Sequence, residues 1–235
     1  MKTFKQKGGP FAERPYFELN DIERICADEL HAVGLLPSEP GPVRIERFIE
    51  KRFGVSPIYD ELPDGVLGYS EFGAKGVQAI VVSQVLAGEA STTASRRVST
   101  TLAHEAGHGL LHAHLFVLGA PQRGLFGQEV TSPKILCRTD SSPIAVTGKR
   151  YDGRWWEHQA NLAIGALLLP RRLVAKCLRS LIVSSGTLGL GQELPAGERE
   201  RAALRIAEVF DVNPVVARIR LSELYPPTRG GQLTL

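Results

Sequence analysis

Apolar residues recur at helical spacing in the first quarter of the chain. Between residues 20 and 34 they lie three or four positions apart, which predicts a helix that begins at Asn20 or Asp21. Glu23 follows Asn20 by three residues and is placed to complete a capping box. Residues 45–53 repeat the apolar spacing. They predict a second helix with one apolar face.

Short apolar runs separated by turn residues follow these helices. Residues 57–60, 65–72 and 78–83 are divided by clusters of Gly, Pro and Asp, which predicts three short strands. A further apolar patch at 135–137 predicts another strand. From strand order alone, segments 65–72 and 79–83 are candidates for an edge strand that pairs with an extended peptide.

Helical spacing dominates the remainder of the chain. The predicted helices cover residues 95–116, 154–169, 170–181, 197–210 and 213–224, with a Ser- and Gly-rich linker at 184–191. Pro214 occupies the first-turn position that proline favours. A group of short strands between helical segments indicates an α+β protein. We expect a small, mostly antiparallel sheet beside the long helix, with helical segments before and after.

The composition indicates one main domain with attached segments. The chain has 235 residues, 43% of them hydrophobic and 23% charged, which is ordinary for a globular protein. We expect a loose or partly docked arm over 1–17, a main domain over 18–181, a helical cap over 182–225 and a tail over 226–235. Residues 118–152 are rich in Gly, Pro, Ser and Thr, and whether they gate a site is left open.

Charge and cysteine content exclude several classes of protein. A net charge of +3 is too small to indicate a nucleic-acid-binding surface. No apolar run reaches the roughly 18 residues that a membrane span needs, and no secretory signal is visible. The three cysteines Cys26, Cys137 and Cys177 are widely spaced, which indicates reduced thiols. We therefore expect a cytoplasmic protein that binds no membrane.

The strongest chemical signal lies in the long predicted helix. His104 and His108 are four residues apart, so both imidazoles share one helix face and can hold one metal ion. Glu105 stands beside them without sharing that role. Gly107 costs a helix about 1 kcal/mol relative to alanine, which indicates a close approach of backbone or substrate. This pattern predicts a metal site with an adjacent general base.

A catalytic zinc ion takes a third protein ligand, and three candidates exist. His112 lies eight residues after His104, or about 12 Å along a helix, so one ion cannot bind both together with His108. We expect His112 to support the site or to pack in the core. His114 has the spacing of the metzincin pattern, but Leu111 replaces the helix-breaking glycine of that pattern. We therefore expect the helix to continue and to carry His114 away.

A distant carboxylate is the remaining candidate. Glu157 begins a second helix behind Trp155 and Trp156, and Asn161 lies one turn further along the same side. A carboxylate on a strongly apolar helix needs a partner, and a cation is the obvious one. The alternative is a surface charge that the helix dipole favours. One tryptophan is expected in the core, and a role in lining a substrate groove stays open.

The two motifs together resemble those of the ImmA/IrrE-type metallopeptidases. His104 to His108 matches the first signature, and the stretch from Glu157 through Asn161 to Pro170 matches the second without a gap. The resemblance spans about residues 45–181 and implies a gluzincin-type site in which Glu157 is the third ligand. It also implies an endopeptidase that cleaves a specific helix–turn–helix repressor.

The chemistry implied by this set of residues is peptide hydrolysis. Zinc would activate a water molecule, with Glu105 as general base, and the identity of the ligands does not separate zinc from manganese. Candidates for stabilising the oxyanion are His158, Tyr151, Arg138 and Tyr69. Cys137 is a candidate regulatory thiol, although a small buried side chain is the simpler interpretation.

Two alternatives to an active peptidase are kept. One is a catalytically silent protein that binds metal and a protein partner. The other is a DNA-binding regulator that uses the C-terminal helical pair, where Arg218 and Arg220 fall on the second helix. Five apolar residues of that pair predict docking on the main domain instead: Val212, Val215, Val216, Ile219 and Leu221. The sequence leaves the oligomeric state open.

Overall fold

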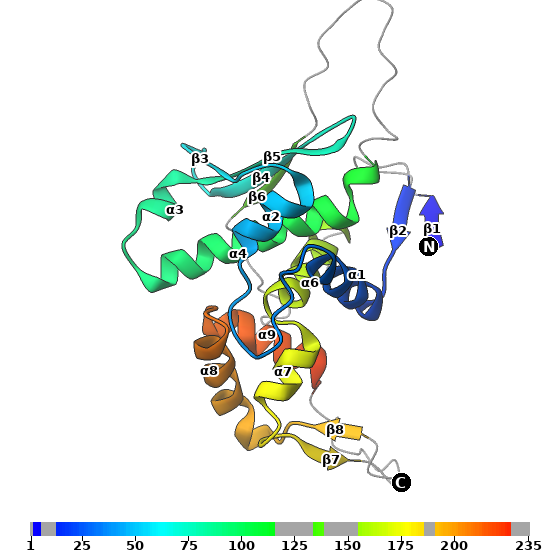
Figure 1. Ribbon diagram of the computed structural model, residues 1–235, viewed down its shortest axis with the longest axis vertical. Helices are drawn as coiled ribbons and strands as arrows, with labels where there is room; N and C mark the ends of the chain where they lie inside the picture. Colours follow the sequence, from blue (N-terminus) through cyan, green and yellow to red (C-terminus); the bar gives the residue numbers. More distant parts are fainter. Residues whose placement is uncertain (1, 6–12, 116–133, 139–154, 186–190, 227–235) are drawn as a thin grey trace, which may run out of the picture.

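The computed structural model describes residues 2–5, 13–115, 134–138, 155–185 and 191–226 (Figure 1). The helices are α1 (Leu19–Ala32), α2 (Ile45–Phe53), α3 (Gln84–Gly88), α4 (Thr92–Leu111), α6 (Trp155–Leu168), α7 (Arg171–Cys177), the 3-10 helix η3 (Ala196–Glu198), α8 (Arg199–Val209) and α9 (Pro214–Leu224). The strands are β1 (Lys2–Lys5), β2 (Glu13–Tyr16), β3 (Ile58–Asp60), β4 (Val66–Gly73), β5 (Gly76–Ser83), β6 (Lys134–Arg138), β7 (Val183–Ser185) and β8 (Gly191–Glu193). The fold is α+β, as predicted.

A four-stranded sheet covers one side of α4 (Figure 1). Its order is β3-β5-β4-β6, and only the β3–β5 pair is parallel, so the predicted mostly antiparallel sheet is confirmed. Alternate residues of β4, among them Gly68 and Ser70, are buried. Because β4 lies between β5 and β6, and β5 lies between β3 and β4, the prediction that segments 65–72 and 79–83 provide an edge strand is wrong. The edges of this sheet are β3 and β6.

Helix α6 packs against the opposite side of α4 at very short range. A Cβ atom added to Gly107 would lie 2.8 Å from the Ala163 Cβ and 3.2 Å from the Ala160 carbonyl oxygen. Real Cβ atoms essentially never approach another heavy atom within 3.0 Å. The predicted close approach at Gly107 is confirmed, and it lies between the two helix backbones.

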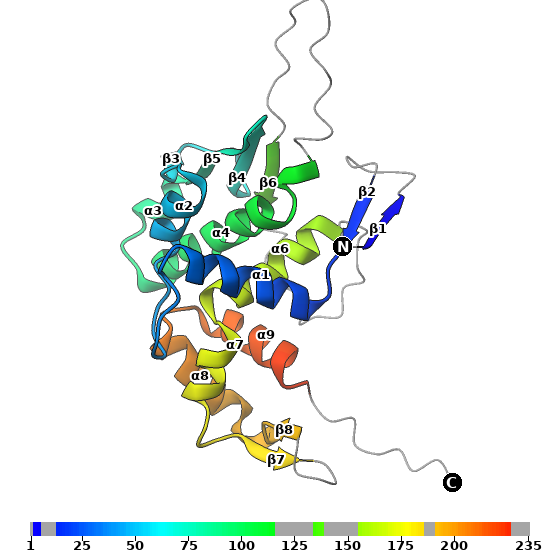
Figure 2. The same cartoon turned by 45° about the vertical axis from the view of Figure 1, so that its right-hand side comes forward.

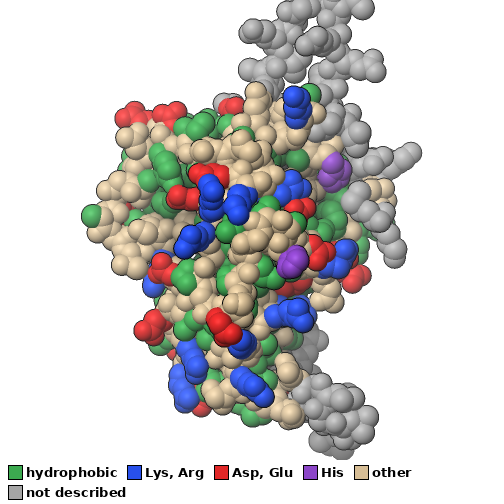
Figure 3. Space-filling view, viewed as in Figure 1, with side chains coloured by type: hydrophobic (Ala, Val, Ile, Leu, Met, Phe, Trp, Pro, Cys, Tyr) green, Lys and Arg blue, Asp and Glu red, His purple; other side chains and the backbone are tan. Residues whose placement is uncertain are grey.

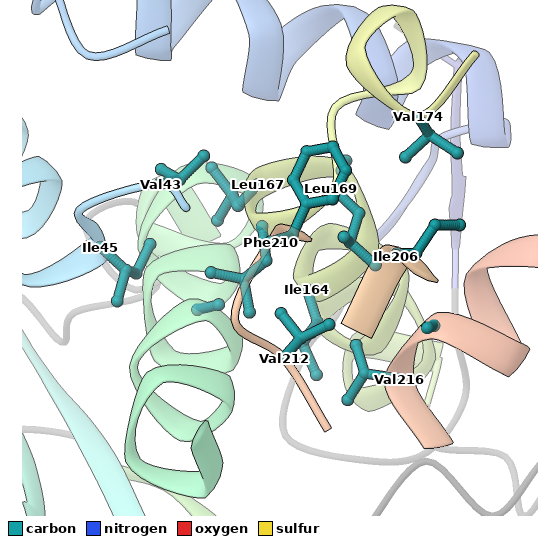
Figure 4. Close-up of a cluster of buried hydrophobic side chains, with 14 of the residues drawn as sticks. Val43, Ile45, Ile164, Leu167, Leu169, Val174, Ile206, Phe210, Val212 and Val216 are labelled. Atoms are coloured by element: carbon teal, nitrogen blue, oxygen red, sulfur yellow. The ribbon is translucent and has the colours of Figure 1, made fainter. Parts of the chain in front are cut away.

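The C-terminal pair α8–α9 packs on the main domain through one continuous core. Phe210, Val212 and Val216 join Ile164 and Leu167 of α6 in this core (Figure 4). The predicted docking is therefore confirmed, except that Val215 is 44% exposed. Its position on the outer face of α9 explains the difference, because only one face of a docked helix is covered.

The two arginines of α9 are both engaged within the protein. Arg220 is fully buried and donates from Nε to the Leu169 carbonyl oxygen over 3.0 Å. Arg218 forms two hydrogen bonds with Glu200 of α8. On the face shown in Figure 3, basic and acidic side chains are interspersed. These contacts weigh against phosphate binding by this helix.

Several predictions about the chain's segments need adjustment. Helix α1 begins one or two residues earlier than predicted, and its capping box joins Glu18 and Asp21 instead of Asn20 and Glu23. In the predicted arm, β1 and β2 form an antiparallel pair. Both ends of the predicted linker form strands, β7 and β8, because Val183–Ser185 pairs with Gly191–Glu193.

Other predictions fall on parts of the chain that are only partly described. The predicted strand at 135–137 is confirmed as β6, while the rest of segment 118–152 lies outside the described residues. None of the helices in the described ranges is long and apolar enough to cross a lipid bilayer.

Candidate metal centre

The two histidines of the first motif lie on the buried face of α4. Every residue from Thr101 to Gly109 is buried, so this part of the helix has both faces covered. His104 is 2% exposed and His108 is fully buried. Unpaired polar side chains are costly at such positions, which means that both imidazoles need partners.

Glu157 reaches these imidazoles from the first turn of α6. It is 7% exposed, although its helix has a strongly apolar buried face. The close crossing of α4 and α6 at Gly107 brings the carboxylate to the two rings. The three side chains form the group of His, Cys, Asp and Glu residues that could hold a metal ion within the described part of the chain.

The distances between the three side chains fit a tetrahedral ion. The two Nε2 atoms of His104 and His108 are 3.0 Å apart. Glu157 Oε2 lies 3.2 Å from His104 Nε2, and Oε1 lies 3.7 Å from His108 Nε2. Ligand atoms about 2.0–2.1 Å from a tetrahedral zinc ion are separated by roughly 3.3 Å. The donor set and its spacing both fit a zinc ion.

The protein's own charges favour an ionised Glu157. Burial opposes its charge, but the adjacent imidazoles of His104 and His108 hold the pKa of this carboxyl well below its usual range. Burial lowers the pKa of His108 to about 4, with the charge of His104 contributing. For His104, burial is outweighed by Glu157 and Glu105, so its pKa is raised. A divalent cation would replace the proton that this cluster otherwise holds.

Glu105 lies beside the cluster and is held by the sheet. Its side chain is fully buried, and Ser70 of β4 donates to its Oε2 over 2.6 Å. Its other oxygen, Oε1, has no hydrogen-bond partner among the described residues. Burial raises the pKa of Glu105 to about 7, although His104 and Ser70 counteract part of the effect. A carboxyl group with this pKa can exchange a proton near neutral pH.

Both imidazoles are oriented by groups on their far side. His104 Nδ1 lies 3.1 Å from Asn161 Oδ1, which accepts a hydrogen bond from it. His108 Nδ1 lies 3.0 Å from His112 Nδ1. His112 is fully buried, and its Nε2 lies 2.9 Å from Gln159 Oε1. His112 is therefore buried in the core and also contacts a candidate metal ligand, so both predicted roles stay open.

The predicted reason for placing His114 away from the site is wrong. Helix α4 ends at Leu111, with His112 as its C-cap, so the helix does not continue to His114 as predicted. His114 nevertheless stays outside the candidate metal group. Tyr69 lies on the face of β4 opposite to Ser70, because neighbouring strand residues alternate, and its candidacy for stabilising an oxyanion stays a prediction.

The other predicted residues are placed as follows. His158 is exposed on α6, next to Glu157, and stays a candidate for binding substrate. Trp155 is 1% exposed in a small core with Phe72, while Trp156 is partly buried against it. Tyr151 and the side chains of Cys137 and Arg138 lie outside the described residues.

Sequence analysis did not identify Ser70 or Gln159 as part of the site. Ser70 interrupts an otherwise apolar buried face of β4, and this is the signal that a strand pattern offers. Gln159 lies within the second motif but is separated from its partner His112 by 47 residues. Comparison with protein-family models and with curated proteins finds no match for this chain.

Proposed function

We propose that the protein is a zinc-dependent endopeptidase with a gluzincin-type centre. The observation that carries this proposal is the convergence of His104 Nε2, His108 Nε2 and the Glu157 carboxylate, with the unpartnered Oε1 of Glu105 beside them. Three protein ligands plus an adjacent carboxylate are what hydrolysis at a zinc ion requires.

The roles of the side chains follow from their contacts. His104, His108 and Glu157 would hold zinc, which lowers the pKa of a bound water and polarises a peptide carbonyl. Glu105 accepts a proton at Oε1 and passes it to the leaving amine. Ser70 donates a hydrogen bond to the other oxygen of Glu105, which fixes the orientation of the carboxylate and therefore of Oε1. Because the cluster is buried, the local dielectric constant is low and the electrostatic interactions among these groups are strong.

The substrate class comes from the resemblance of the two motifs to the ImmA/IrrE-type metallopeptidases. It implies cleavage of a specific helix–turn–helix repressor by a cytoplasmic enzyme. The buried Arg220 and the paired Arg218 support the peptidase over the DNA-binding alternative. A catalytically silent metal-binding protein is the alternative that the experiments below address.

Metal analysis tests the ligand set. The wild-type protein should retain one equivalent of zinc after dialysis, and Glu157→Ala should lose it. Glu208→Ala removes an exposed glutamate elsewhere and should retain the metal. Manganese in place of zinc would change the metal but keep the site. Full zinc retention by Glu157→Ala would contradict the assignment of the third ligand.

Hydrolysis is tested with candidate helix–turn–helix repressors, beginning with any that is encoded beside the gene for this protein. The zinc-loaded wild type should cleave one of them at one position, as seen by mass spectrometry. Glu105→Gln should keep the zinc and lose activity by about 10³-fold, because the amide cannot accept the proton. Intact repressors in both reactions would favour the catalytically silent alternative. A fully active Glu105→Gln variant would remove the general-base assignment.

A further inference from the structure

A line of hydrogen-bonding groups joins the backbone of β2 to His108. Gln159 Nε2 donates to the Pro15 carbonyl oxygen over 3.0 Å. Gln159 Oε1 lies 2.9 Å from His112 Nε2, and His112 Nδ1 lies 3.0 Å from His108 Nδ1. These groups come from β2, α6 and the C-terminal end of α4, which lie side by side (Figure 2). Gln159, His112 and His108 are all buried.

The direction of every hydrogen bond in this line follows from its first member. A proline carbonyl only accepts, so the amide NH₂ of Gln159 must face Pro15. The amide oxygen then faces His112 and requires a proton on His112 Nε2. Burial favours the neutral imidazole, which carries one proton. His112 Nδ1 is therefore an acceptor, and His108 Nδ1 must donate to it.

The position of this proton decides whether His108 Nε2 can bind a metal ion. A neutral His108 with its proton on Nδ1 has a lone pair on Nε2, the atom nearest to His104 Nε2 and Glu157. Metal ions bind an imidazole through such a lone pair. If the proton of His112 moved to Nδ1, His108 would carry its own proton on Nε2, where it would oppose a metal ion.

We propose that Gln159 and His112 are positioning residues that hold His108 in its metal-binding tautomer, with the Pro15 carbonyl setting the direction. This inference rests on the proposed metal centre. It makes the docked β2 strand part of that centre, although Pro15 and Gln159 are 144 residues apart. His104 differs, because the Asn161 amide orients it directly.

The tautomers can be measured in chelator-treated wild-type protein, without any substitution. Two-bond ¹H–¹⁵N correlation spectra distinguish a proton on Nδ1 from one on Nε2. We expect His108 to be protonated on Nδ1 and His112 on Nε2. A proton on His108 Nε2 in place of Nδ1 would overturn the proposal, and this measurement does not depend on whether a variant folds.

Zinc affinity gives the second test, by competition with a chromophoric chelator. Gln159→Leu and His112→Phe should each weaken binding by about 10- to 100-fold. The double variant should lose no more zinc affinity than the single variant with the larger loss, because both changes break the same line of hydrogen-bonding groups. Gln192→Leu, an exposed glutamine on β8, is the matched control and should bind like the wild type.

The outcomes separate this proposal from the proposed function. Independent packing defects would make the two losses add, and that result would overturn the coupling, as would unchanged affinity in Gln159→Leu. A wild-type protein that binds no divalent metal contradicts the metal centre instead. In that case the His108 tautomer still decides whether Gln159 directs the protons.

Discussion

Ser70 Oγ lies 2.6 Å from Glu105 Oε2, so the central strand of the sheet holds the carboxylate next to the candidate metal ligands. Both side chains are fully buried. The contact leaves only Oε1 without a partner among the described residues. The sheet therefore orients the proposed general base, in addition to covering α4.

Removal of the Ser70 hydroxyl should weaken the base. The hydrogen bond favours the carboxylate form, so Ser70→Ala raises the pKa of Glu105 above about 7. Because the carboxylate is the active form, the acidic limb of the profile of kcat/KM against pH should move to higher pH. We expect kcat/KM at pH 6.5 to fall about tenfold, with zinc content unchanged. The exposed Ser222→Ala is the control, and an unmoved limb in Ser70→Ala would argue against this role.

Asn161 should be required for tight metal binding. Its Oδ1 accepts from His104 Nδ1, which fixes the ring so that Nε2 lies on the side of Glu157, where the metal ion would bind. Asn161→Leu should raise the zinc dissociation constant about 10- to 100-fold, as chelator competition would show. Asn20→Leu, which removes an exposed asparagine of α1, should leave zinc affinity unchanged. Equal affinities in the two variants would exclude this contribution of Asn161.

The crossing of α4 and α6 should tolerate no side chain at Gly107. The new Cβ of Gly107→Ala would lie 2.8 Å from the Ala163 Cβ, so the helices must separate. We expect the free energy of unfolding to fall by about 1–3 kcal/mol and zinc binding to weaken. Gly88→Ala meets nothing within 4 Å and serves as the control for urea denaturation. A Gly107→Ala variant as stable as Gly88→Ala would contradict the close approach of α4 and α6 at this residue.

Glu223 should make stability depend on pH. Two carboxylates, Glu23 and Glu223, share the buried Arg220, and burial raises the pKa of Glu223 to about 7, with Glu23 adding to the shift and Arg220 opposing it. A carboxyl whose pKa is higher in the folded state contributes stability below about pH 4.5. That contribution is lost as the pH rises through 7.

The size of this effect is measurable by urea denaturation at pH 5 and pH 8. Glu223 should account for a loss of at most about 3 kcal/mol between these values. Glu223→Gln should flatten the dependence, because the amide does not titrate. The same slope in wild type and Glu223→Gln would assign it to other groups, and Glu208→Ala controls for loss of a surface charge.

Most helices and strands could be predicted because their signals are local. Helix α2 matches the predicted residues 45–53, and β4 differs from its prediction by one residue at each end. The prediction failed where an element depends on a pairing partner in another segment. Val183 forms a strand only because Gly191–Glu193 pairs with its segment, and a Ser- and Gly-rich composition gives no sign of that pairing.

The residues of the candidate site differ in the same way: local signals predicted some of them, and contacts between distant segments added the others. His104 and His108 could be assigned from the sequence, since one helical turn places residues four apart on one face whatever surrounds the helix. Whether Glu157 reaches them depends on the approach of α4 to α6, and the matching of motifs only suggested it. Ser70 and Pro15 belong to the candidate site because they form hydrogen bonds with residues 35 and 144 positions away in the chain. The amino-acid sequence by itself thus determined the helices, the strands and the two histidines, through short-range periodicity. Only the tertiary structure decided which strand, amide and carbonyl complete the centre, because such contacts depend on how the elements pack.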